Sequence, residues 1–241
     1  MYIYKYYPLF DDDVESDKRL APLRNNHLWM SNWEQLNDPT EFSYFIKGKK
    51  IFDKMCSTPG DMLIASFSQT KNSLPMWAHY ANNHTGFVVK YRAIKCVNNN
   101  LYKVRYIKNP LNIFEIGNLC DSNYNDTSIK FERFFLGENH KSIDASRLFL
   151  EGAEIASKVK IEICRIKNNQ WKYEKEYRII IPNGLNFLKE NLLPFEYAFI
   201  EPTQIYTGIF CRKENLEKLV DLSKIWGLKM PIQIKIDDLY R

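Results

Sequence analysis

The stretch that says most about the fold is residues 64–91, IASFSQTKNSLPMWAHYANNHTGFVVKY. An apolar run over residues 62–68 ends in Ser-Phe-Ser, and residues 86–91 form a second, β-branched run; both are typical of buried strands. The segment between them predicts a short helix over residues 76–83. It carries four side chains suited to a site: Trp77, His79, Tyr80 and His84. Polar and aromatic residues between two strands usually lie at the mouth of a sheet, so we predict a binding or catalytic site here.

A second stretch, WKYEKEYRIII over residues 171–181, looks like the partner of the first. Residues 176–181 predict a strand, and if Glu176 starts it, the two-residue period of a strand puts Glu174, Glu176 and Arg178 on one side. An arginine beside a carboxylate holds it ionised and oriented, and the aromatic rings just upstream would shield the pair from water. The alternative interpretation is an ordinary ion pair on a solvated strand face.

The rest of the chain predicts an α+β fold. Alternating or short apolar segments predict further strands at residues 2–7, 27–31, 101–107, 195–200, 204–210 and 231–240. Helices are predicted at residues 17–25, 142–167 and 213–227, the last with Gly227 as its C-cap. Residues 108–137 show no clear pattern. The strand spacing is too irregular for repeated βαβ units, so we expect a single domain over residues 1–241, with a mixed or mostly antiparallel sheet and flanking helices.

Composition sets the broad class. The chain of 241 residues is 45% hydrophobic and 26% charged, which is the balance of a globular protein with a sizeable core. The net charge of +5 is spread along the chain without a basic block, which permits an anionic ligand but does not indicate a nucleic-acid arm. Aromatic residues make up 15% of the chain; most must lie in the core, and a few are candidates to line a pocket for a planar ligand such as a nucleobase.

Cysteine usage and hydropathy indicate the compartment. The five cysteines are far apart in sequence and form no CxxC pair, which favours reduced thiols over disulfides or zinc. The N-terminal residues have no apolar run of the length found in signal peptides, and no stretch approaches the roughly 18 apolar residues of a membrane span. We therefore expect a soluble, cytoplasmic protein with no membrane contact.

The motifs of several large enzyme classes are absent: the sequence has no GxGxxG, GxxxxGK[ST], GxSxG or HExxH. His79 and His84 are separated by five positions, about 140° around a helix, so they would not share a face and we expect no metal site. Each histidine is also explained as a structural residue that bonds a backbone carbonyl. Without metal, two histidines with pKa values of about 6.5 would suit proton transfer.

Several motifs resemble a bacterial family of unknown function, the domain-of-unknown-function family 2971. Its members begin with a Tyr-Lys-Tyr strand, continue with a Leu…Trp/Phe-Ser segment and an Asn-Asp-Pro turn, and then show Phe-Ser. Met-Trp-x-His-Tyr-x-x-x-His-x-Gly-Phe follows, and a late Trp-x-x-Glu-x-Glu-Tyr-Arg completes the set. In this chain the motifs lie, in the family's order, at residues 4–6, 28–31, 37–39, 67–68, 76–87 and 171–178.

A weaker resemblance is to ADP-ribosyltransferases, which use an early Arg or His on a strand, a Ser-Thr-Ser-like motif or Tyr on a later strand, and a Glu-x-Glu or single Glu. In those enzymes the last Glu bonds the nicotinamide ribose of NAD and stabilises an oxocarbenium-like transition state. The resemblance implies that Glu176 is the catalytic carboxylate and that Glu174 orients the acceptor. Lys5 or His27 would take the early position, and residues 66–68 would take the place of the serine motif.

The same resemblance implies that NAD is a substrate, with earlier elements holding its amide and phosphates and aromatic rings enclosing the nicotinamide. His79 joins the two glutamates as a candidate catalytic residue. The candidate NAD-binding residues are Tyr4, Lys5, Ser31, Ser66, Ser68, Trp77, Tyr80, His84 and Arg178.

Three functional hypotheses stay open. The first is an NAD-dependent ADP-ribosyltransferase-like enzyme, a bacterial toxin or phage-defence effector, whose acceptor is a protein or nucleic acid of unknown identity. The second is a metal-independent nuclease or other phosphodiester hydrolase with His79 and His84 as acid and base. The third is a non-catalytic module that binds a nucleotide or peptide in an aromatic cleft. Whatever the chemistry, we expect the two stretches to face each other across one cleft, with Ser68, Trp77, His79 and Tyr80 opposite Glu174, Glu176 and Arg178.

Overall fold

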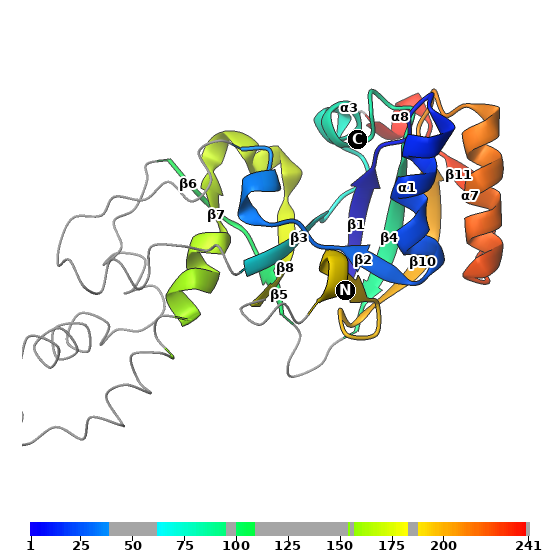
Figure 1. Cartoon of the computed structure of the whole chain (residues 1–241). Coiled ribbons are helices and arrows are strands. Elements are labelled where there is room, and N and C mark those ends of the chain that lie inside the picture. Colours follow the sequence, from blue (N-terminus) through cyan, green and yellow to red (C-terminus); the bar gives the residue numbers. More distant parts are fainter. Residues whose placement is uncertain (39–61, 95–99, 109–153, 155–156, 183–187, 240–241) are drawn as a thin grey trace, which may run out of the picture.

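A seven-stranded sheet forms the centre of the fold (Figure 1). The computed structural model describes residues 1–38, 62–94, 100–108, 154, 157–182 and 188–239. Across the sheet the strands are β11 (Ile232–Gln233), β10 (Ile200–Thr207), β4 (Phe87–Ala93), β1 (Tyr2–Tyr7), β3 (Met62–Ser68), β8 (Glu176–Pro182) and β5 (Leu101–Lys103). Neighbouring strands are antiparallel except for β10 and β11, which are parallel. The predicted α+β fold with a mostly antiparallel sheet is confirmed.

Shorter elements surround this sheet. Two small sheets pair β2 (His27–Trp29) with β9 (Leu192–Pro194) and β6 (Arg105–Ile107) with β7 (Ile166–Asn168). The helices are α1 (Asp13–Arg24), α3 (Leu74–Tyr80), α7 (Lys213–Ile225), α8 (Ile236–Leu239) and a helical segment at residues 157–164. Short 3₁₀ helices form η1 (Trp33–Gln35), η2 (Asn169–Glu174) and η3 (Lys189–Asn191).

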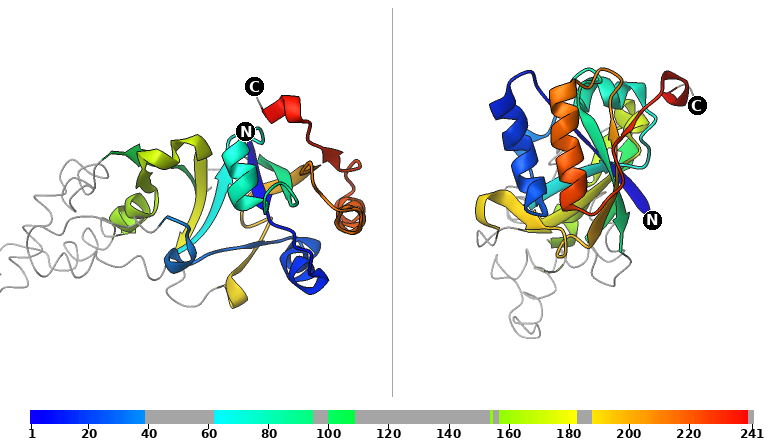
Figure 2. Two further views of the ribbon diagram at one scale, coloured as in Figure 1. Left: turned by 90° about the horizontal axis from the view of Figure 1, so that it is seen from above. Right: turned by 90° about the vertical axis from the view of Figure 1, so that its right-hand side faces the viewer.

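The two faces of β1 belong to two separate cores. On one face Ile3 packs with Leu20 of α1 and Leu219 of α7, and these two helices lie side by side in Figure 2. On the other face Tyr6 packs with Trp77 of α3. Successive strand residues point to opposite sides, which is why the alternating pattern of residues 2–7 was a sound predictor of this strand.

The sheet opens between β1 and β3. All seven residues of β3 pair with β8, whereas β1 and β3 share a single register pair, Tyr4 with Ser68. Beyond that pair, the Lys5 Nζ donates a hydrogen bond of 3.0 Å to the carbonyl oxygen of Ser66 and so spans the gap between the strands. Residues of both strands line a cleft at this opening.

Two predicted elements around the opening have different boundaries. The helix predicted over residues 142–167 ends at residue 164, and Ile166–Asn168 forms β7 instead. The strand predicted over residues 101–107 divides at Val104, because β5 pairs with β8 whereas β6 pairs with β7. Residues 109–153 lie outside the described residues, so the patternless segment over residues 108–137 is almost wholly outside them.

Three predicted strands near the C-terminus are wrong in part. The strand predicted over residues 204–210 ends at Thr207, the last residue of β10. Residues 195–199 form turns that end at Phe199, which has φ of 51°, and the strand β10 begins only at the next residue. Over residues 231–240 the strand is limited to β11, and α8 follows. The acidic side chains of Asp237 and Asp238 in the first turn of α8 favour a helix because they interact well with its free N–H groups.

Gly208 packs against the loop that follows α3. A Cβ atom at this position would lie 1.9 Å from the backbone oxygen of His84, which also accepts a hydrogen bond of 3.1 Å from the Phe210 N–H. The added methyl group would clash with backbone atoms of His84, which cannot rotate away as a side chain could. We therefore expect Gly208→Ala to lower the free energy of unfolding by about 3 kcal/mol in urea denaturation. Gly227→Ala is the matched control, since Gly227 has φ of 63° but open space around it, and it should cost only about 1 kcal/mol. Equal losses would contradict a rigid contact at Gly208.

Candidate functional site

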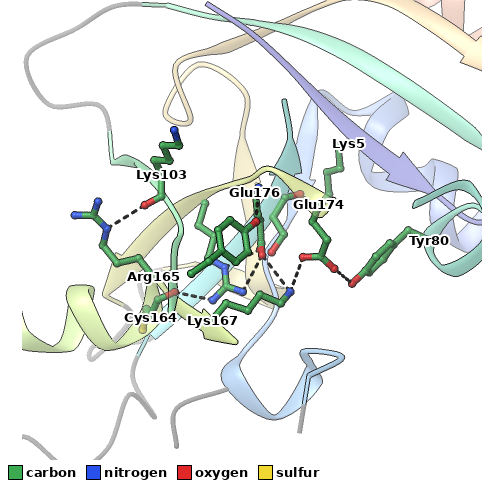
Figure 3. Close-up of polar contacts among 11 residues, drawn as sticks. Lys5, Tyr80, Lys103, Cys164, Arg165, Lys167, Glu174 and Glu176 are labelled. Atoms are coloured by element: carbon green, nitrogen blue, oxygen red, sulfur yellow. Dashed lines mark hydrogen bonds and ion pairs between the residues drawn. The ribbon is translucent and has the colours of Figure 1, made fainter. Parts of the chain in front are cut away.

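Four charged side chains cluster at the start of β8 (Figure 3). Glu174 ends η2, Glu176 and Arg178 lie on β8, and Lys167 lies on β7. All four are at most 4% exposed. Burying a single charge would be very costly, but two carboxylates beside two cations compensate each other.

A left-handed residue brings the two carboxylates to one side. The Asn168 side chain accepts a hydrogen bond from the Gln170 N–H and starts η2, which ends at Lys175 with φ of 47°. This residue turns the chain between Glu174 and Glu176. The prediction that both glutamates share a side with Arg178 is therefore confirmed, although for Glu174 a turn, and not the period of a strand, produces the arrangement.

Arg178 holds Glu176 through two hydrogen bonds. Its Nε donates to Oε1 at 2.7 Å and its Nη2 to Oε2 at 3.1 Å, while Nη1 donates to the carbonyl oxygen of Cys164 at 2.7 Å. Burial by itself would raise the pKa of Glu176, but Arg178 and Lys167 outweigh it and hold this pKa well below its usual range. Glu176 is therefore ionised at neutral pH.

Glu174 lies between a cation and a phenol. The Lys167 Nζ donates to its Oε2 at 2.7 Å and also to Oε2 of Glu176 at 3.1 Å, and the Tyr80 hydroxyl donates to the other oxygen of Glu174 at 2.5 Å. Figure 3 shows Lys167 and Tyr80 reaching Glu174 from different sides. Burial and the charge of Glu176 raise the pKa of Glu174 to about 7, against the opposing effect of Lys167. Near neutral pH this carboxyl can take up or release a proton.

The serines of β3 connect this cluster to the neighbouring strand. Ser68 Oγ donates to the backbone oxygen of Glu174 at 2.6 Å, and the side chain of Ser66 hydrogen-bonds the carboxylate of Glu176. On the next strand, burial lowers the pKa of Lys5 to about 8, although the charge of Glu176 opposes this effect. Three adjacent strands, β1, β3 and β8, thus contribute to one site.

A cleft of about 560 Å³ lies over these strands. Most of the residues predicted from the sequence line it: Tyr4, Lys5, Ser31, Ser66, Ser68, His79, Tyr80, Glu174, Glu176 and Arg178. The expectation that residues from the two predicted stretches meet in one cleft is confirmed for Ser68, His79 and Tyr80. His79 is exposed in the wall, and its ring lies 6.5 Å from that of Tyr80.

Trp77 and His84, both expected to bind NAD, are not among the residues lining the cleft. Trp77 is fully buried in the core beneath α3, where its Nε1 donates to the carbonyl oxygen of Lys71 at 2.7 Å. His84 stacks on Trp77 with 6.1 Å between ring centres and has φ of 67° in the loop after α3. Both side chains therefore hold α3 in place.

Only one of the two histidines named for the phosphodiesterase hypothesis lies in the cleft. His79 lines it and His84 does not. His27 is also absent from the lining, and its Nδ1 lies 2.6 Å from the Asn25 carbonyl oxygen. Of the two candidates for the early basic residue, Lys5 is therefore the one in the cleft.

Two residues of the site were missed in the sequence. Lys167 falls at the end of the helix predicted over residues 142–167, and no local pattern marks it as the residue that joins the two carboxylates. Asn37, whose side chain hydrogen-bonds the Tyr80 hydroxyl, lies in the Asn-Asp-Pro motif. That motif, which predicts a turn, is the sequence signal for Asn37.

Within the described part of the chain, no three His, Cys, Asp or Glu side chains are grouped so that they could hold a metal ion. Glu174 and Glu176, the closest pair of carboxylates in the site, are already engaged by Lys167 and Arg178. The described helices also include none with the length and apolar character needed to cross a membrane.

A family match covers the middle of the chain. Residues 76–179 match the family described as "Protein of unknown function (DUF2971)". The matched segment begins in α3 and ends in β8, so it contains both Tyr80 and the cluster of four charged residues; β1 and β3 precede it. No curated protein and no solved structure matches the chain. The resemblance seen in the motifs is confirmed over this segment, and the description of the family gives no activity.

Proposed function

We propose that the protein is an NAD-consuming enzyme of the ADP-ribosyltransferase kind, which breaks the bond between nicotinamide and ribose. One observation carries the proposal: the neighbouring strands β1, β3 and β8 bring Lys5, the Ser66–Ser68 segment and the Glu174–Glu176 pair into one cleft. The serine segment and the Glu-x-Glu pair correspond to two of the elements that ADP-ribosyltransferases use, in the same order along the chain, and Lys5 stands where those enzymes have an Arg or His.

The charge states of the two glutamates fit two different roles. As the nicotinamide leaves with the electron pair of the C–N bond, positive charge develops on the ribose, and an ionised carboxylate stabilises it. Glu176, whose pKa lies far below neutral, is suited to this role. Glu174, with a pKa of about 7, is suited to accept the proton of the acceptor hydroxyl or amine as the new bond to ribose forms. Two carboxyls whose surroundings separate their pKa values commonly divide the work in this way.

The remaining residues of the cleft would bind and orient NAD. Tyr4 and Tyr80 provide aromatic surface beside the carboxylates, and Lys5 provides a cation between the two halves of the sheet. The protein would use cytoplasmic NAD, and an enzyme that depletes NAD can serve as a toxin or a phage-defence effector. The acceptor would be a protein or a nucleic acid.

The test is nicotinamide release by the purified protein. We expect the purified protein to release nicotinamide from NAD with water as the acceptor, measured by chromatography, and to label a macromolecular acceptor when a bacterial lysate is added with radioactive NAD. NAD that stays intact with protein, RNA and DNA acceptors would contradict the proposal. RNA cleavage with NAD untouched would favour a phosphodiesterase, and tight NAD binding without release would favour a non-catalytic module.

A further inference from the structure

The cleft has a second region, on the α1 side of the opening between β1 and β3, that none of the roles above uses. This distal region is formed by α1 and by β2, and its walls include Arg19, Pro22, Leu23 and Trp29. In Figure 1 the chain passes from α1 through β2 towards η1, which lies near β3 and β8. The same segment therefore links the distal region to the charged cluster.

Arg19 supplies a cation that no described residue pairs with in the distal region. It is exposed on α1, and within the described part of the chain its side chain forms no ion pair or hydrogen bond. Its neighbour Lys18 also lines the cleft but is paired with Glu15 at 2.6 Å. A guanidinium presents several N–H donors in one plane, an arrangement that suits the oxygens of a phosphate. Arg19 is thus the group available to an anion here.

Trp29 supplies an aromatic surface in the same region. Its side chain is 42% exposed, although it is one of the largest apolar side chains in the protein. Among the described residues its ring stacks on no other ring and its indole N–H has no acceptor. Pro22 and the buried Leu23 add apolar surface to the wall. An exposed indole beside apolar side chains is suited to stack on a planar base.

We propose that the distal region is a subsite for a nucleoside diphosphate, with the base stacked on Trp29 and the phosphates bound by Arg19. The proposal deepens the proposed function and rests on it for one point, that this nucleoside diphosphate is the adenosine diphosphate half of NAD. The reacting nicotinamide ribose would then lie at Glu174 and Glu176, and the enzyme would select a dinucleotide over a mononucleotide.

The subsite can be tested by binding, without any reaction. ADP, inorganic pyrophosphate and adenosine are titrated separately into the full chain by calorimetry. Arg19→Ala is expected to weaken ADP and pyrophosphate binding about tenfold and to leave adenosine binding unchanged, since a charge-assisted hydrogen bond is lost. Trp29→Ala is expected to weaken ADP and adenosine binding about tenfold and to leave pyrophosphate binding unchanged.

Three further variants keep the binding test falsifiable. Trp29→Phe retains a ring and should restore most of the affinity for adenosine. Arg24→Ala removes another arginine of α1, which is paired with Asp17 and does not line the cleft, and it should bind ADP like the wild type. Tyr197→Ala removes an exposed ring elsewhere and should do the same. ADP binding that is absent from the wild type, or unchanged in both Arg19→Ala and Trp29→Ala, would overturn the subsite.

Kinetics separate the subsite from the proposed function. With NAD, Arg19→Ala and Trp29→Ala should raise KM about tenfold with kcat nearly unchanged, because contacts remote from the reacting bond are lost. With nicotinamide mononucleotide, which lacks the adenylate half, neither variant should differ from the wild type. Nicotinamide release with an unaltered KM for NAD in both variants would overturn the subsite and leave the proposed function standing. ADP binding that depends on both residues, with no nicotinamide release, would support the subsite and overturn the proposed function.

Discussion

Glu176→Gln is expected to reduce nicotinamide release from NAD about a thousandfold, because the neutral amide cannot stabilise positive charge on the ribose. Glutamine keeps the shape of the side chain, so the loss should appear in kcat more than in KM. Chromatographic measurement of initial rates at saturating NAD would check this. The matched control is Glu201→Gln, which removes an exposed carboxylate of β10 that is paired with Arg92 of β4. Both strands lie on the side of β1 away from β8, so the rate should stay unchanged.

The same substitution is also expected to destabilise the protein. It leaves Arg178, which is fully buried, beside a neutral partner, and breaking a buried ion pair in this way costs about 3 kcal/mol. A double variant, Glu176→Gln with Arg178→Met, removes both charges and should recover much of that stability in urea denaturation. It should not recover activity. A double variant that regains both stability and nicotinamide release would show that Glu176 has only a structural role.

The main strands were predictable from local patterns. Residues 62–68 are mostly apolar because β3 is covered on both faces. The alternation of residues 2–7 reflects the two cores on either side of β1. The end of the helix at residue 164 could not be predicted locally. Its last carbonyl, that of Cys164, is bonded by Arg178, a residue that is distant in sequence and whose contact depends on the folded sheet.

The site was predictable as far as it follows from strand order and side-chain type. The Ser-Phe-Ser and Glu-x-Glu segments meet because β3 and β8 pair in register, with Ser68 opposite Glu176. Trp77 was misplaced because an aromatic residue on a short helix fits a core face as well as a cleft. The direction of the His84 side chain depends on the left-handed backbone of residues 82–84. The two asparagines before it are only a weak sequence signal for that backbone conformation.

Lys167 could not be found from the sequence, yet it is the side chain that bonds both carboxylates. It bonds the two Oε2 atoms, whereas Arg178 bonds Glu176 and Tyr80 bonds Glu174. Its positive charge lowers the pKa of both glutamates, against burial, which raises them. The groups that face Glu174 are Glu176, Lys167 and Tyr80, with Tyr173 and Tyr106 in its field. Lys167 is thus placed to set the pH at which Glu174 gives up its proton.

In the wild type, transfer to an acceptor should increase with pH through about 7, as Glu174 loses its proton and becomes able to accept that of the acceptor. Removing a neighbouring positive charge favours the protonated form of a carboxyl, so Lys167→Met should move this rise to higher pH by about one to two units. Lys167→Arg keeps the charge and should keep the wild-type profile. Lys172→Met, which removes an exposed lysine of η2 outside the cleft, is the matched control. If Lys167→Met lowers the rate equally at every pH, Lys167 acts only by supporting the fold, since a loss of packing alone would not move the pH of the transition.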